Sequence, residues 1–327
     1  MKKILVIQTA SIGDVILATP VVEKLHASFP DAMLDILVKK GNENLFTGHP
    51  FLHEVLVWDK SSRSLRNFDK LLHKVWFTQY DLVVNIQRFF LTGLMTAFSR
   101  AGMKIGFDKN PLSFLFSKRI PHIISQPMHE RDRNLSLISE ITDNAPVSPR
   151  LYPTAEDFEK VAPFNSGTYY TFSPASLWFT KQYPAVQWSS LIRLIPSDRK
   201  IYLLGSKSDR ELCDEIITLS GSRSCRNLAG ELSFLESAAL MKKAKMNFTN
   251  DSAPMHLASA VNAPVTAIFC STIPEYGFGP LSDDSAVLQT DEPLRCKPCG
   301  LHGLKQCPEK HFRCATTLKA EKLYERC

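Results

Sequence analysis

Short apolar runs alternate with amphipathic stretches along the chain. In the first half, five runs have the length and continuity of buried strands: 4–7, 34–38, 55–57, 82–86 and 104–107. Between the first two, residues 15–29 place their apolar side chains on one helical face, with Pro20 either kinking the helix or marking its start. Continuous apolar strands that alternate with helices predict a parallel sheet covered on both faces.

The same alternation resumes after an interval at 143–168 that is rich in proline and lacks periodicity, which is typical of a linker. Further strands are predicted at 169–172, 201–204, 246–249 and 265–269. Ser208 with Glu211, and Ser233 with Glu236, have the spacing of capping boxes and predict two helix starts. With 327 residues, the chain is long enough for two domains of about 150 residues each.

Composition and charge narrow the class of protein. The sequence shows no signal peptide and no run of about 18 apolar residues, so we expect a cytoplasmic protein without a spanning helix. The formal net charge is +6, and the first 150 residues carry +5 of it. A basic first half is compatible with anionic lipid, a phosphorylated substrate or nucleic acid, or with an ordinary solvated surface.

The first segment with candidate chemistry follows the first predicted strand and contains Ser11, Gly13 and Asp14. It is neither G-x-G-x-x-G nor a P-loop, which disfavours classical dinucleotide or ATP binding. Glycine in a turn lets the backbone approach a ligand. Asp14 has two interpretations at a helix start: a capping residue that complements the helix dipole, or a general base.

The second segment, 173–181, follows the predicted strand 169–172. Its small hydroxyl residues Ser176 and Thr180 and its Lys181 suit a diphosphate, because hydroxyls donate hydrogen bonds and an ammonium neutralises charge. The alternative is an ordinary loop that carries a surface lysine.

The third segment, 250–258, runs from a strand into a helix that Pro254 initiates. Exposed backbone N–H groups at such a start bind anions, and His256 lies close enough to donate to a phosphate. The alternative is a structural histidine, and Asp251 and Ser252 beside it favour the functional interpretation.

Four cysteines near the end of the chain form the fourth segment: Cys296, Cys299, Cys307 and Cys314. Four thiols this close are able to hold zinc, but their spacing fits no standard finger. We expect reduced structural cysteines or an adventitious disulfide in purified protein, and no metal.

Together, these segments resemble glycosyltransferase family nine, the ADP-heptose:lipopolysaccharide heptosyltransferases. The resemblance covers nearly the whole chain and rests on residues 11–15 with Thr19-Pro20, on 173–184, on 250–258 and on the cysteine-rich tail 296–314. Residues 250–258 match the family pattern N-D-S-G-P-M-H-L-A most specifically, with Ala253 in place of glycine. Segment 173–184 is similar to P-G-A-S-x-x-x-K-x-W-P, but one added residue leaves open whether Ser176 or Thr180 touches phosphate.

The resemblance implies an α/β protein of the GT-B type, with two doubly wound Rossmann-like domains that face an interdomain cleft. The acceptor-binding domain would be 1–160 and the nucleotide-sugar domain 161–314, and a last helix at 315–327 would cross back to the first domain. It also implies heptose transfer from ADP-heptose to the lipopolysaccharide inner core, by an inverting single displacement without a cofactor or essential metal.

In that mechanism Asp14 deprotonates the acceptor hydroxyl. Asp209 is the candidate for the nucleotide ribose, because Glu211 is assigned to a capping box. The donor-binding set is Ser176, Thr180, Lys181, Asp209, Asp251, Ser252, Ala253 and His256, and the acceptor-binding set is Gly13, Arg88 and Arg131.

The implied partners are a nucleotide sugar, a lipid-linked core acceptor and the cytoplasmic face of the inner membrane, with no nucleic acid. Residues 89–98 are either a membrane-facing patch or core. Three alternatives stay open: another donor such as a UDP-hexosamine, a non-catalytic nucleotide-binding protein, and a nicotinamide or methyl-donor Rossmann enzyme. The presence of Asp14 and Lys181 argues against the second, and the missing glycine fingerprint against the third.

Overall fold

The computed structural model describes residues 1–60, 65–124 and 128–327. The chain divides into two compact units, Met1–Tyr152 and Pro153–Cys327. The division falls inside the predicted linker 143–168, eight residues before the expected boundary at 160. Within the described ranges, no helix is both long and apolar enough to cross a membrane.

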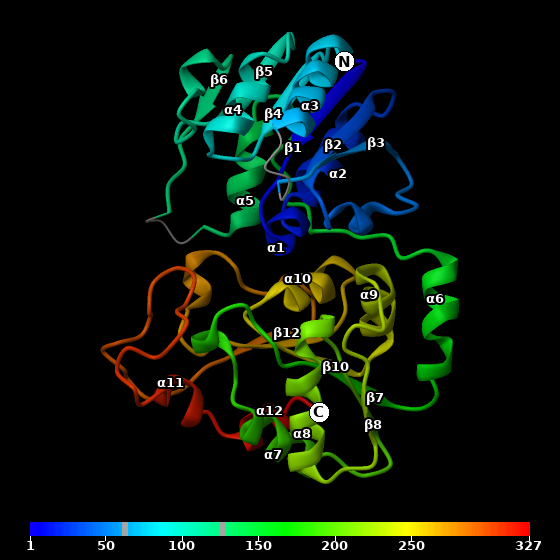
Figure 1. Cartoon of the computed structure of the whole chain (residues 1–327), viewed down its shortest axis with the longest axis vertical. Coiled ribbons are helices and arrows are strands. Elements are labelled where there is room, and N and C mark those ends of the chain that lie inside the picture. The colour runs from blue at the N-terminus through cyan, green and yellow to red at the C-terminus, as the bar shows by residue number, and fades with distance from the viewer. Residues whose placement is uncertain (61–64, 125–127) are drawn as a thin grey trace. The chain divides into compact units, whose positions relative to one another are not determined.

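The first unit contains a six-stranded parallel sheet in the order β3-β2-β1-β4-β5-β6 (Figure 1). Its strands are β1 (Lys3–Ile7), β2 (Met33–Lys39), β3 (Leu52–Trp58), β4 (Leu82–Asn85), β5 (Met103–Phe107) and β6 (Lys118–Ile120). Five of the six were predicted, and β6 is the addition. The four residues 4–7 of β1 are completely buried, as expected for a central strand covered on both faces.

The helices of the first unit are α1 (Ile12–Ile16), α2 (Thr19–Ser28), α3 (Leu65–Thr78), α4 (Phe90–Ala97) and α5 (Glu130–Leu135), with short 3-10 helices η1 (Glu43–Phe46), η2 (Ser113–Leu115) and η3 (Ser136–Ile138). The single helix expected at 15–29 is two helices. Pro20 lies in the first turn of α2, where its missing N–H costs nothing, and therefore marks a helix start.

The second unit repeats this topology, with the order β12-β11-β10-β7-β8-β9. Its strands are β7 (Tyr169–Ser173), β8 (Lys200–Leu203), β9 (Cys225–Asn227), β10 (Met246–Asn250), β11 (Val265–Ile268) and β12 (Ser285–Leu288). In each sheet the first strand of the unit pairs with the second on one side and the fourth on the other. This doubly wound order places ligands outside the carboxyl ends of the first and fourth strands, here β1 and β4, and β7 and β10.

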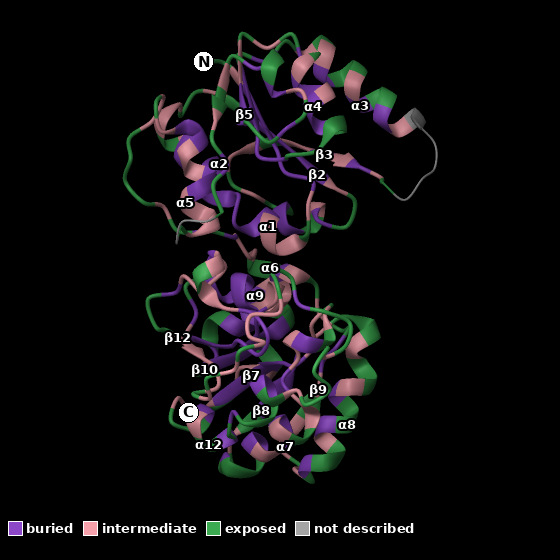
Figure 2. Cartoon of the chain, turned by 90° about the vertical axis from the view of Figure 1, so that its left-hand side faces the viewer, coloured by how far each residue is buried: buried purple, intermediate pink, exposed green. Residues whose placement is uncertain are grey.

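The helices of the second unit are α6 (Ala155–Val161), α7 (Ala185–Leu194), α8 (Arg210–Ser220), α9 (Phe234–Lys243), α10 (Ala253–Ala260), α11 (Arg313–Thr316) and α12 (Ala320–Tyr324), with 3-10 helices η4 (Ala162–Phe164), η5 (Phe179–Lys181), η6 (Lys207–Asp209) and η7 (Pro274–Tyr276). Buried positions concentrate on the strands and on the inner helix faces (Figure 2). Trp188 on α7 packs against Phe172 of β7 and Tyr183, and anchors the core of this unit.

The last helix, α12, packs on α7, and Leu323 belongs to the core of the second unit. One expectation from the sequence is wrong in detail. The capping box before α8 uses Ser206 and Asp209, not Ser208 and Glu211. The box of Ser233 and Glu236 before α9 is confirmed.

Candidate functional site

Asp14 lies on α1, just beyond the carboxyl end of β1. Its carboxylate accepts hydrogen bonds from the Ser11 hydroxyl and from the Ser11 backbone N–H, the latter at 3.2 Å. These bonds close a capping box, so the capping interpretation is confirmed. Gly13, expected in a turn, lies within α1 itself. The box fixes the Asp14 carboxylate at the edge of the sheet where ligands bind in this topology.

Glu130 on α5 is a second acid near Asp14, and nothing in its local sequence marks it as a site residue. Burial raises its pKa; the charge of Arg133 opposes this rise and the charge of Asp14 adds to it, while Arg88 lowers the pKa slightly. Arg133 is itself buried, bonds Glu130 and donates to the carbonyl oxygen of Ile123 at 3.1 Å. Two acids and two arginines thus interact electrostatically at this end of the first unit.

Arg88 follows β4 and borders an open basin of about 700 Å³, which is lined by Arg88, Phe89, Lys109, His122, Ile123 and Ile124. The loop that carries Arg88 is held in place by buried Asn110, whose amide donates to the carbonyl oxygens of Gln87 (3.1 Å) and Phe89 (3.0 Å). The basin combines cations with apolar side chains, which suits an amphiphilic anion.

His122 gives the basin a neutral hydrogen-bonding ring at physiological pH. Burial, with contributions from the charges of Arg88 and Arg133, lowers the pKa of His122 to about 4. Its ring packs edge-on against Phe107 with centroids 4.7 Å apart. Arg131, expected to face the acceptor, instead makes two hydrogen bonds to the neighbouring Asp132, at 2.8 and 3.0 Å. Two N–H donors of its guanidinium are therefore engaged within α5.

In the second unit, Lys181 and Asp251 form an ion pair at the carboxyl ends of β7 and β10. The ammonium nitrogen lies 2.7 Å from Asp251 Oδ2, and the two side chains are 15% and 8% exposed. Thr272 donates to the same carboxylate oxygen at 2.6 Å. A lysine this far buried and paired is not the surface lysine of the alternative interpretation. Thr272 is a contributor that the sequence analysis missed.

Asn250, completely buried at the end of β10, connects the two loops of this site. Its amide donates to the Pro174 carbonyl oxygen at 2.6 Å, and its Oδ1 accepts from the Tyr183 N–H at 3.0 Å. The segment after β7 is thereby fixed beside the start of α10. Asn250 belongs to a predicted segment, but its role depends on partners that are distant in sequence.

The start of α10 has the predicted geometry. Ser252 is its N-cap in extended conformation, with Ala253 and Pro254 next, and the Ser252 side chain makes no capping bond to the helix. The first N–H groups of α10 therefore keep the anion-binding capacity of a helix N-terminus. His256 lies one turn further on and is 4% exposed.

The hydroxyls of the donor set differ in availability. Thr180 is buried, and its oxygen accepts from the Leu304 N–H at 2.7 Å and from the Ser271 hydroxyl at 3.0 Å. Ser176 is only partly buried and its carbonyl oxygen accepts from Gln182 at 2.7 Å. Asp209 Oδ2 closes a capping box in this structure, because it accepts from the Ser206 N–H and hydroxyl, both at 2.7 Å. The reason for preferring Asp209 to Glu211 is therefore reversed.

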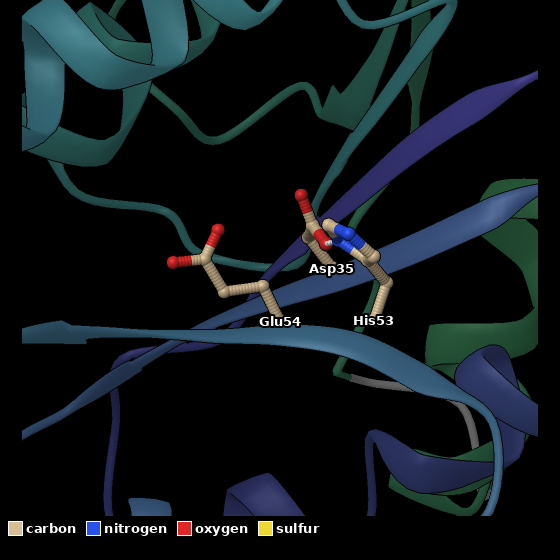
Figure 3. A group of neighbouring side chains, drawn as sticks. All are labelled: Asp35, His53 and Glu54. Carbon is tan, nitrogen blue, oxygen red and sulfur yellow. Dashed lines mark hydrogen bonds and ion pairs between the residues drawn. The ribbon is translucent and has the colours of Figure 1, made fainter.

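The cysteines are all reduced. Cys296 Sγ lies 3.8 Å from His311 Nε2, and burial raises the pKa of Cys314 to about 11. Among the described residues, the side chains of metal-ligating type whose ligand atoms lie close together are Asp35, His53 and Glu54, not the four cysteines (Figure 3).

Each carboxylate of that group already has protein partners. Asp35 contacts the His53 ring at 2.9 Å and accepts from the Tyr80 hydroxyl at 2.7 Å, and Glu54 pairs with Lys74. The group is therefore explained as a hydrogen-bonded network on β2 and β3.

Comparison with known proteins places this arrangement in a family. The model of glycosyltransferase family 9 (heptosyltransferase) matches residues 68–311. The chain is 26% identical to lipopolysaccharide heptosyltransferase 2 of Escherichia coli K12 over 306 residues, covering 88% of each protein. It is 25% identical to an Escherichia coli lipopolysaccharide heptosyltransferase 3, covering 80% of this chain and 81% of the relative. The solved structure of Escherichia coli ADP-heptose heptosyltransferase II superposes with a TM-score of 0.81 at 20% identity, over 100% and 97% of the two chains.

Proposed function

We propose that this chain transfers a heptose from ADP-heptose to an acceptor in the lipopolysaccharide inner core. The premise is that the chain belongs to glycosyltransferase family 9 and is thus a glycosyltransferase of two-domain GT-B fold. The observation that carries this proposal is the buried pair of Lys181 and Asp251 beside the start of α10. It brings a cation and helix N–H groups to the edge of the sheet where a doubly wound domain binds its ligand.

The second unit would bind the donor. Lys181, Ser252 and the first N–H groups of α10 would stabilise the negative charge that develops on ADP as the bond to the anomeric carbon breaks. Ser176 is the better candidate for a phosphate contact than Thr180, because Ser176 is partly exposed whereas Thr180 is buried. Ala253 would contribute its backbone, His256 would support this start of α10, and Asp251 would hold Lys181 in place. Asp209 would reach a ribose through Oδ1 while Oδ2 keeps the cap.

The first unit would bind the acceptor. Asp14 would take the proton of the acceptor hydroxyl as its oxygen forms the new bond to the anomeric carbon, with inversion and departure of ADP. Arg88 and Lys109 would attract acidic groups of the core, and Gly13 would allow close approach to the start of α1. Arg131 would offer the acceptor the N–H donors that Asp132 does not use.

The same basin offers a contact with the membrane that carries a lipid-linked acceptor. Phe89, Ile123 and Ile124 line it and are exposed, beside the cations Arg88 and Lys109. Apolar side chains that enter the interface, next to cations that meet anionic headgroups, are the features of peripheral binding. We therefore propose attachment of the protein to the cytoplasmic face of the inner membrane.

Calorimetric titration with ADP, UDP and NAD separately tests the donor assignment. We expect ADP to bind, UDP and NAD to bind more weakly, and Lys181→Ala to lose most of the ADP affinity. A preference for UDP would keep the glycosyltransferase and change its donor. Binding of NAD alone would contradict the proposed function.

A further inference from the structure

The segment 297–304, which we call the strap, returns after β12 across the carboxyl ends of the central strands of the second unit. Lys297 donates to the carbonyl oxygen of Phe269, just beyond β11, at 2.9 Å. The Cys299 N–H donates to the carbonyl oxygen of Ser271 at 2.8 Å. The start of the strap is therefore attached to the chain that leaves β11.

The end of the strap is attached to the residue before Lys181. The Thr180 N–H donates to the Leu304 carbonyl oxygen at 3.1 Å, and the Leu304 N–H donates to Thr180 Oγ1 at 2.7 Å. Ser271 donates to the same Oγ1 at 3.0 Å. Thr180 is thus held between the strap and the segment after β11.

Gly303 brings the strap into direct contact with Lys181. It is buried and has φ of +78°, a conformation that favours glycine. A Cβ at this position would lie 2.9 Å from Lys181 Cγ, 3.2 Å from Lys181 Cδ and 3.1 Å from Thr180 Oγ1. The backbone of Gly303 therefore lies where any side chain would displace the stem of Lys181.

We propose that Gly303 and Leu304 are positioning residues that hold Lys181 toward Asp251 and the start of α10. The strap forms one wall along the aliphatic stem of Lys181, and Asp251 binds the ammonium at its end. Losing rotamer freedom before the ligand arrives lowers the entropic cost of binding a diphosphate. The inference rests on the proposed function only where it assigns that diphosphate to Lys181.

Gly303→Ala tests the strap, and Gly300→Ala is its matched control. Gly300 has φ of +85°, but a Cβ there would have no atom within 4 Å. Alanine at this position therefore introduces the backbone strain without a contact to Lys181. In the full chain, Gly303→Ala is expected to weaken ADP binding about tenfold, the loss of one charge-assisted hydrogen bond. Gly300→Ala is expected to retain the wild-type affinity.

A second readout does not depend on the nucleotide. Acylation of lysines by an N-hydroxysuccinimide ester, followed by mass spectrometry, measures how accessible Lys181 is relative to exposed Lys319. We expect faster labelling of Lys181 in Gly303→Ala than in wild type or Gly300→Ala. Faster labelling in a protein that binds no ADP in any form would support the strap and contradict the proposed donor. If Gly303→Ala and Gly300→Ala show equal Lys181 labelling and equal ADP affinity, the proposal that the strap positions Lys181 is wrong.

Thr180→Val keeps the test decisive if Gly303→Ala does not fold. Valine retains the shape of threonine but removes the oxygen that receives the Leu304 and Ser271 hydrogen bonds. Faster labelling of Lys181 in this variant would support the strap, whereas wild-type labelling in a folded Thr180→Val protein would overturn it.

Discussion

The ammonium of Lys181 lies 2.7 Å from the carboxylate of Asp251, and both side chains are mostly buried. The two residues are 70 positions apart in the chain. Lys181 follows β7 and Asp251 follows β10, and these two strands are neighbours in the sheet. The topology of the sheet therefore creates the pair. Removing one member of a buried ion pair strongly lowers folding stability, because the other member remains as an unpaired buried charge.

Asp251→Asn is expected to destabilise the second unit by about 3 kcal/mol, since it leaves the Lys181 ammonium without its counter-charge. Urea unfolding followed by circular dichroism measures the change. Adding Lys181→Met removes the stranded charge and should restore much of the loss, which a double-mutant cycle detects. Additive losses in the cycle would mean that the two side chains are not coupled.

Asp14→Asn is expected to lower turnover by about 100-fold or more, since a general base contributes on that scale, while ADP affinity stays unchanged. Ser11→Ala is the control, because it removes the capping partner and leaves the carboxylate. Its cost should be about 1 kcal/mol of stability, without a comparable loss of turnover. Equal losses of turnover in both variants would assign Asp14 to the cap alone.

The stability of the first unit should fall as the pH drops from about 6.5 toward 4. Burial lowers the pKa of His122 and of His49 to about 4 in the folded chain, from an ordinary value of 6.5. In this pH range the unfolded chain takes up protons that the folded chain does not. The stability that the two neutral histidines contribute is therefore fully present above pH 6.5 and is lost as the pH falls toward 4.

Thermal unfolding of His122→Gln and His49→Gln between pH 7 and pH 4 checks this pH dependence. Each substitution should remove part of the decline, and the double variant should remove more than either. A decline as steep as in the wild type would contradict neutral burial of these two rings.

Phe89→Ser and Ile123→Ser should weaken binding to vesicles rich in phosphatidylglycerol, because each removes an apolar side chain beside the basic groups of the basin. Phe77→Ser is the matched control, since Phe77 is exposed to a similar degree on α3 (69%, against 63% for Phe89) and does not line the basin. Cosedimentation measures the bound fraction. An equal loss in the control variant would indicate nonspecific adsorption rather than a docking surface.

The hydrophobic pattern alone predicted the strands that are mostly buried, because burial on both faces leaves few polar positions. It missed β6, β9 and β12, none of which contains a fully buried residue. The sequence predicted the capping box before α8 at Ser208 and Glu211, whereas the structure forms it at Ser206 and Asp209, a pair with the same spacing. Asp209 lies close to the backbone of Gly205, where a Cβ would be 2.9 Å from Asp209 Cβ.

The candidate site was predictable where chemistry follows a strand directly, as Asp14, Lys181 and Asp251 do. Its other components come from distant segments: Glu130 from α5, Thr272 from the segment after β11 and Gly303 from the strap. Tertiary contacts give these residues their roles, and nothing in their local sequence marks them. Arg131, predicted as a basic residue in the expected region, pairs with its sequence neighbour Asp132, which the sequence pattern did not indicate.

Transfer of a labelled heptose from ADP-heptose to heptose-deficient lipopolysaccharide by the purified chain tests the central claim most directly. We expect labelled lipopolysaccharide and equimolar ADP with the wild-type protein, and neither above background with Asp14→Asn or Lys181→Ala. No transfer from ADP-heptose, combined with transfer from a different nucleotide sugar, would contradict the proposed donor. Undiminished transfer by both variants would contradict the proposed site.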